Sequence, residues 1–214
     1  MKPFDIRIDE YDNVIDNLEM AAHFLEHISP SIKWKWVTIA IYQALYGFLI
    51  CALQGTDARQ TVYDKRKDSG KAASLHAHRV PKNVIAASFG VSEQMVDKWL
   101  AEPYLIGIDE AINRAKKKDS FIWSDCKPLV TTPDDDAAII ELVKCFRNEF
   151  EHFAPKHWSL DTSQIHLAIC RVLRVIRFIA LESNCVVFAD DKQEQRARAA
   201  FSKLDSMLNE TPPV

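Results

Sequence analysis

Residues 37–53 form an apolar run that limits, more than any other feature, what this chain can fold into. The spacing of the large side chains around it predicts a helix over residues 31–55. Because its second half is apolar on nearly every side, other elements must cover this helix, as happens at the centre of a bundle. With about 17 residues, including Thr38 and Gln43, the run is short for a membrane span of about 20. We therefore expect a buried central helix and no membrane anchor.

Glycine is scarce, with only five in the chain, whereas 48% of the residues are hydrophobic. A β-sandwich needs closely spaced turns, so this composition favours helices. We expect an all-α fold, an up-and-down bundle in a single domain over residues 1–214. An insertion at about 56–105 should hold a basic loop and short helices, between the second helix and a later helix that carries the candidate site. The predicted helices cover residues 12–28, 31–55, 108–118, 132–153, 160–182 and 192–209, and residues 83–100 form a further ordered segment.

The helix over 132–153 has clear start and stop signals. Thr132 is a favourable N-cap, Pro133 fits the first helical position, and the acidic residues that follow suit the positive end of the helix dipole. Pro155 ends it. On a wheel of about 100° per residue, one stripe is apolar and should face the core. It comprises Ile139, Leu142, Val143, Phe146, Phe150 and Phe153.

The opposite face of the same helix carries Arg147, Asn148, Glu151 and His152. Cleaving RNA without a metal needs a base, an acid and positive charge on the developing phosphorane. Histidine titrates near neutral pH, and arginine has a permanently charged planar fork, so both residue types fit these tasks. One histidine serves two proton transfers poorly, whereas a two-fold dimer would bring two histidines and two arginines to one phosphate.

This pattern resembles the HEPN domains (higher eukaryotes and prokaryotes nucleotide-binding), whose signature is Arg, four to six residues, then His. Arg147 matches the signature arginine, Asn148 the polar residue that often follows it, and His152 the signature histidine. The resemblance implies an α-helical homodimer that cleaves RNA without a metal, as in toxin–antitoxin and other defence systems. It also implies RNA and an antitoxin protein as partners. Some HEPN members carry a regulatory tyrosine two residues after the histidine, where this chain has Ala154.

The same residues have a plainer interpretation. Arg147 and Glu151 are spaced as an i,i+4 ion pair, and His152 is then a solvated histidine near a helix C-terminus. The protein would in that case be a catalytically silent helical dimerisation module. A net charge of −3 argues against a protein that coats nucleic acid all over, but it leaves room for a local basic patch.

Three arginines form such a patch on the helix over 160–182, for which Ser159 is the predicted N-cap. Arg171, Arg174 and Arg177 fall on one side, opposite an apolar stripe. They are candidates for binding RNA phosphates. The alternative is an ordinary solvated helix face.

Residues 83–100 carry a second resemblance, to a helix-turn-helix motif. Gly90 would make the turn, and Ser92 would cap a recognition helix over 93–100. The preceding residues 56–82 hold seven Lys and Arg against three Asp, which suits DNA. Glu93 and Asp97 would repel phosphates, so a structural hairpin is the favoured interpretation, and a DNA-binding regulator is the alternative function.

Metal and cofactor sites are not expected. The pairs His23/His27 and His76/His78 bring no third ligand, and so few glycines exclude a P-loop or Rossmann site. The cysteines show no CxxC spacing and sit mostly in apolar runs, which indicates buried free thiols in a reducing compartment. We therefore expect a cytoplasmic protein.

Overall fold

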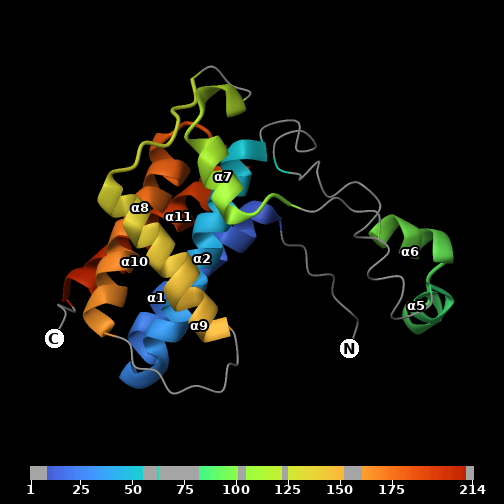
Figure 1. Ribbon diagram of the computed structural model, residues 1–214, viewed down its shortest axis with the longest axis horizontal. Helices are drawn as coiled ribbons and strands as arrows, with labels where there is room; N and C mark the ends of the chain where they lie inside the picture. Colours follow the sequence, from blue (N-terminus) through green and yellow to red (C-terminus); the bar gives the residue numbers. More distant parts are fainter. Residues whose placement is uncertain are drawn as a thin grey trace.

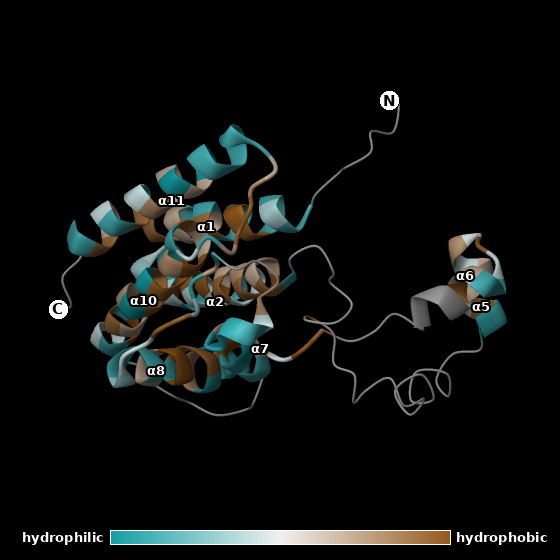
Figure 2. Ribbon diagram, turned by 90° about the horizontal axis from the view of Figure 1, so that it is seen from above, coloured by the Kyte–Doolittle hydropathy of each residue, from teal (hydrophilic) through white to brown (hydrophobic). Residues whose placement is uncertain are grey.

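The computed structural model describes residues 9–54, 62, 82–100, 105–121, 125–151 and 161–210. The described residues form helices joined by turns, and none of them forms a β-strand, so the predicted all-α class is confirmed. Figure 1 shows a bundle of helices around α2, with α5 and α6 lying apart from it. In Figure 2, α1 and α11 lie on one side of α2 and α8 lies on the other.

The first two helices form an antiparallel pair. Helix α1 (Glu10–His27) begins at the N-cap Asp9, whose carboxylate accepts a hydrogen bond from the Asp12 amide at 2.7 Å. Helix α2 (Pro30–Gln54) follows at once, with its proline in the first turn. Both predicted spans are confirmed to within two residues.

Helix α2 is the centre of the bundle, as predicted. It packs against α1, α7, α10 and the π-helical segment η2 (Glu141–Arg147). Its fully buried residues include Ile41, Leu45, Phe48 and Leu49. At Gly47 the two first helices come so close that an added Cβ would lie 2.0 Å from Val14 Cγ1. This is the one helix among the described residues long and apolar enough to span a membrane, and most of it is buried in the bundle.

The middle of the chain forms three consecutive elements along one rod. Helix α8 (Pro133–Ile140) starts at Thr132, whose hydroxyl and amide exchange hydrogen bonds with Asp135 in a capping box, which confirms the predicted N-cap. The π-helical segment η2 (Glu141–Arg147) and the short helix α9 (Asn148–Glu151) continue it. Before them lie α7 (Ile108–Ala115) and the 3₁₀ turn η1 (Lys118–Ser120).

Helix α10 (Thr162–Arg177) passes into a second π-helical segment, η3 (Phe178–Glu182). Its N-cap is Asp161, which accepts from the Ser163 amide at 2.8 Å, so the prediction of Ser159 as N-cap is wrong. An aspartate at this position accepts the hydrogen bond as well as a serine does. The apolar stripe of α10 is buried as predicted, and Figure 2 shows apolar faces turned inward in the bundle.

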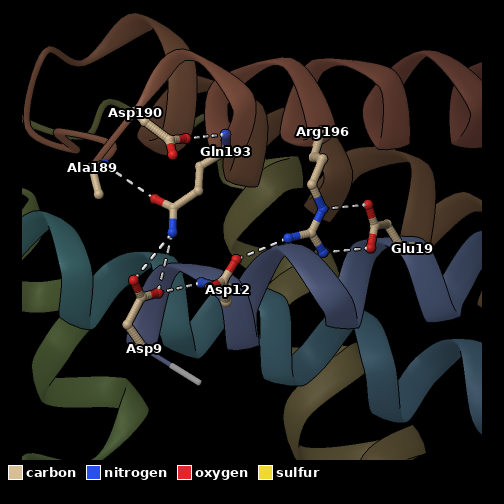
Figure 3. Close-up of polar contacts among 7 residues, drawn as sticks. All are labelled: Asp9, Asp12, Glu19, Ala189, Asp190, Gln193 and Arg196. Carbon is tan, nitrogen blue, oxygen red and sulfur yellow. Dashed lines mark hydrogen bonds and ion pairs between the residues drawn. The ribbon is translucent and has the colours of Figure 1, made fainter. Parts of the chain in front are cut away.

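Helix α11 (Asp191–Glu210) closes the bundle against α1 through a polar seam. Arg196 donates to both carboxylate oxygens of Glu19, at 3.0 and 2.7 Å, and to Asp12 at 2.8 Å (Figure 3). Nearby, the buried Gln193 donates to Asp9 at 3.1 Å and accepts from the Ala189 amide at 3.0 Å. The seam ties the two ends of the described chain together.

Helices α5 (Lys82–Phe89) and α6 (Glu93–Leu100) form a hairpin. Its buried residues Ala86 and Val96 are not part of the main core cluster. Short helices thus occur between α2 and α8, as expected. The insertion boundary at 56–105 and the single-domain assignment stay predictions.

Candidate functional site

Arg147 is the last residue of the π-helical segment η2, and its side chain is half-buried. The guanidinium carbon lies 4.5 Å from the centre of the Tyr42 ring, so the cation stacks on an aromatic face of α2. Its Nη1 donates a hydrogen bond to Asn148 Oδ1 at 3.0 Å. Two neighbours on different elements therefore fix the orientation of this cation.

The wheel predicted that Arg147 faces away from the core, and this is wrong. The apolar stripe of the helix is buried as expected, from Ile139 to Phe146. Arg147, however, packs against Tyr42 of α2 and does not point into solvent. The reason is the π-helical geometry of η2, in which hydrogen bonds reach one residue further back than in an α-helix. A wheel of 100° per residue assumes regular α-helix, so it misplaces residues at the end of this segment.

Tyr42 belongs to a column of aromatic side chains on α2. Its ring stacks on that of Tyr46, one turn further on, with centroids 6.4 Å apart and planes 18° apart. The Tyr46 hydroxyl donates to the Ile106 carbonyl at 2.7 Å. Burial raises the pKa of Tyr46, and the neighbouring Tyr42 raises it further, so this hydroxyl keeps its proton as a donor.

Asn148 is half-buried at the junction of η2 and α9. Because its Oδ1 accepts from Arg147, the amide holds one edge of the guanidinium. Asn148 was expected to orient the histidine or the substrate, and that role stays a prediction. His152 and the side chain of Glu151 lie outside the described residues, and so do His157 and Ala154. The joint geometry of Arg147 and His152 also stays a prediction.

The three arginines of α10 each form an ion pair. Arg171 contacts Asp134 at 2.9 Å, and Arg174 contacts Asp135 at 3.0 Å, so two of them reach the N-terminal turn of α8. Arg177 pairs with Asp205 of α11. Arg171 also lines a hollow of about 200 Å³ between α8 and α10, beside Glu141 and Leu167. Their role as RNA-binding residues stays a prediction, and an approaching phosphate would compete with these carboxylates.

The α5–α6 hairpin has the turn that the sequence predicted. Gly90 adopts a positive φ of 65°, a conformation that glycine takes without steric cost. The Ser92 hydroxyl accepts from the Met95 amide at 3.3 Å, which confirms the predicted cap. Glu93 is exposed, whereas the side chains of residues 97–100 lie outside the described part. DNA binding through this hairpin stays an alternative.

Within the described residues, no group of three or more His, Cys, Asp or Glu is placed to hold a metal. The His23 and His27 rings lie 4.6 Å apart, and His27 contacts Glu26 at 3.3 Å. His76 and His78 lie outside the described residues. All five cysteines are free thiols, three of them buried, while Cys145 in η2 is exposed.

Sequence reasoning missed Tyr42 and Tyr46 as parts of this site. Their i,i+4 spacing inside an otherwise apolar run was a local signal, because two polar-tipped aromatic residues on one face mark a side that is not fully buried. Nothing in the sequence connected that face with Arg147, which comes from a distant part of the chain.

We compared the chain with models of known protein families, with curated proteins and with solved structures, and none of the three comparisons gave a match.

Proposed function

We propose that this protein is a metal-independent endoribonuclease with a HEPN-type helical bundle, acting as a homodimer. In this proposal Arg147 stabilises the phosphorane, His152 is acid or base, and Asn148 holds the edge of the guanidinium toward the substrate. The observation that carries the proposal is the fixed, half-buried guanidinium of Arg147 within an Arg-x4-His motif on a rigid helix.

A fixed cation suits phosphoryl transfer because little reorganisation is needed when negative charge develops. A mobile surface arginine would have to be ordered during the reaction, which costs side-chain entropy. Arg147 is ordered beforehand, by Tyr42 on its face and by Asn148 at its edge. The two histidines of a dimer would then supply the two proton transfers. A cytoplasmic toxin or defence protein, controlled by an antitoxin, is the setting we propose.

The test is cleavage of a mixed RNA substrate by purified full-length protein in EDTA. Wild type should cleave, while Arg147→Ala and His152→Ala should be inactive yet folded by circular dichroism. Arg198→Ala is the matched control, because Arg198 is an exposed arginine paired with Glu194 on α11. Intact RNA with wild type, under conditions that allow dimers, would end the proposal for the protein alone.

A helix-turn-helix DNA-binding regulator is the second candidate, favoured by the Gly90 turn and the Ser92 cap. Salt-dependent binding of duplex DNA, lost in Lys82→Glu and unchanged in Arg147→Ala, would support it. If neither nucleic acid is bound or cleaved and the protein is still dimeric, the catalytically silent dimerisation module is the remaining interpretation.

A further inference from the structure

The aromatic column beside Arg147 has a defined order. Tyr46 is anchored at its hydroxyl by the Ile106 carbonyl, Tyr42 stacks on Tyr46, and Arg147 stacks on Tyr42. Ile106 is itself buried, with 1% exposure, and its amide donates to the Val62 carbonyl at 2.8 Å. The column thus runs from a fixed backbone carbonyl to the candidate catalytic cation.

Stacking holds a guanidinium by its flat face and consumes none of its N–H donors, which point outward in the guanidinium plane. A ring is therefore well suited to orient an arginine that must meet a phosphate edge-on. Half-burial strengthens the contact, because cation–π attraction grows as the pair is desolvated.

We propose that Tyr42, steadied by Tyr46, is a positioning residue for Arg147 in RNA cleavage. The inference rests on the proposed function. Tyr42 transfers no proton in this scheme. Its ring orients the guanidinium, so its hydroxyl is dispensable. Tyr46 acts one step further away, through the hydrogen bond that fixes its ring.

The experiment compares Tyr42→Leu, Tyr42→Phe and Tyr46→Phe with Tyr11→Leu in steady-state RNA cleavage. Tyr11 is the matched control because it is a half-buried tyrosine on α1 that packs against Phe188, on the α11 side of the bundle. Tyr42→Leu should lower kcat about 10-fold or more, with KM within about two-fold of wild type. Tyr42→Phe should retain activity within about two-fold, because the ring remains.

Tyr46→Phe should give an intermediate loss of a few-fold, since the ring stays while its anchor is removed. The pH profile of Tyr42→Leu should keep its shape and fall uniformly, because no titrating group is lost. A Tyr42→Leu that cleaves as well as Tyr11→Leu, or a Tyr42→Phe as damaged as Tyr42→Leu, would overturn the inference.

A second measurement separates this inference from the proposed function. In the NMR spectrum, the Arg147 Hε resonance should be shifted by the ring current of Tyr42 and should return toward the random-coil position in Tyr42→Leu. If the wild-type protein does not cleave RNA, the proposed function and the positioning role both fail. Cleavage by wild type with an unshifted Arg147 resonance would end the positioning role alone.

Discussion

Arg196 and Arg147 are both half-buried arginines on helices, but the molecule holds them in different ways. The N–H groups at the edge of the Arg196 guanidinium donate hydrogen bonds to the carboxylates of Glu19 and Asp12 across the α1–α11 seam. The flat face of the Arg147 guanidinium stacks on the Tyr42 ring. Arg147 also uses an edge donor, because its Nη1 donates to Asn148 Oδ1, so the two residues differ in the aromatic face contact, which itself occupies no N–H donor.

The surroundings of the two arginines differ in the same sense. The seam gathers acidic groups around Arg196, and the Glu19 hydrogen bond raises the pKa of Arg196 above its usual value despite partial burial. The contacts of Arg147 include the Tyr42 ring of α2, which stacks on Tyr46, and the Asn148 amide. Arg196 joins two helices through carboxylates, whereas an aromatic face helps to orient Arg147. Variants at the two positions test whether this difference matters for activity and for stability.

The largest effect is expected from Arg147→Lys. The charge is kept, but the planar fork and its stacking geometry are lost, so kcat for RNA should fall about 10²- to 10³-fold. The free energy of unfolding in urea should change by less than about 1 kcal/mol. Arg196→Lys is the control and should cleave RNA like wild type. Equal activity of lysine and arginine at position 147 would remove the distinction drawn between the two sites.

Arg196→Ala should be the largest change in stability. It leaves Glu19 and Asp12, which both lie on α1, facing α11 without their shared cation, and we expect a loss of about 2 kcal/mol in urea unfolding. Cleavage measured well below the unfolding midpoint should be unchanged. Adding Glu19→Gln should recover part of the loss, because it removes the repulsion. A loss under about 0.5 kcal/mol would show that the seam does not hold α11.

Much of this fold could be predicted from local signals. The α1 and α2 boundaries follow from periodicity and from Pro30, and the start of α8 follows from Thr132 and Pro133. The Gly90 turn follows from glycine's access to positive φ. Each of these depends on residues close together in sequence, where capping and steric preferences decide the outcome.

The candidate site was less predictable for physical reasons. The π-helical segment η2 has no composition of its own, since Glu141 to Arg147 would suit an α-helix equally well. Its shifted hydrogen bonds turned Arg147 toward α2. The partner on α2 was also hidden, because a cation–π contact between distant segments leaves no spacing pattern in the sequence. Local reasoning found Arg147 and Asn148 but not the Tyr42 ring that stacks on Arg147.

Thr132→Ala tests a third way of holding charge, at a helix N-terminus. Burial raises the pKa of Asp135, but the hydrogen bonds from Thr132, followed by Arg174 and Arg171, outweigh it and lower that pKa below its usual value. A carboxylate with a lowered pKa stabilises the fold above its unfolded pKa of about 4, and this contribution is lost as the pH falls through the folded pKa. At pH 7 we expect a loss of about 1 kcal/mol.

The gap between wild type and Thr132→Ala should narrow as urea unfolding is repeated at pH values below about 4, where Asp135 becomes protonated. Ser88→Ala is the control, because the Ser88 hydroxyl donates to the Val84 backbone carbonyl, which does not titrate, so its gap should not change with pH. A gap that stays constant down to pH 2 would mean that the capping box does not stabilise the charged form of Asp135.

The smallest effect is expected from Arg198→Ala. Arg198 lies on the same helix as Arg196 and pairs with Glu194 at 2.7 Å, but its side chain is 56% exposed. An exposed i,i+4 pair is screened by water and salt, so unfolding in urea should change by no more than about 0.5 kcal/mol. The change should shrink further in about 0.5 M salt. Both arginines lie on α11 and both contact carboxylates. If Arg198→Ala lowered the free energy of unfolding as much as Arg196→Ala does, carboxylate pairing alone would determine how strongly an arginine stabilises this bundle. The half-buried bridge from Arg196 to α1 would then add nothing.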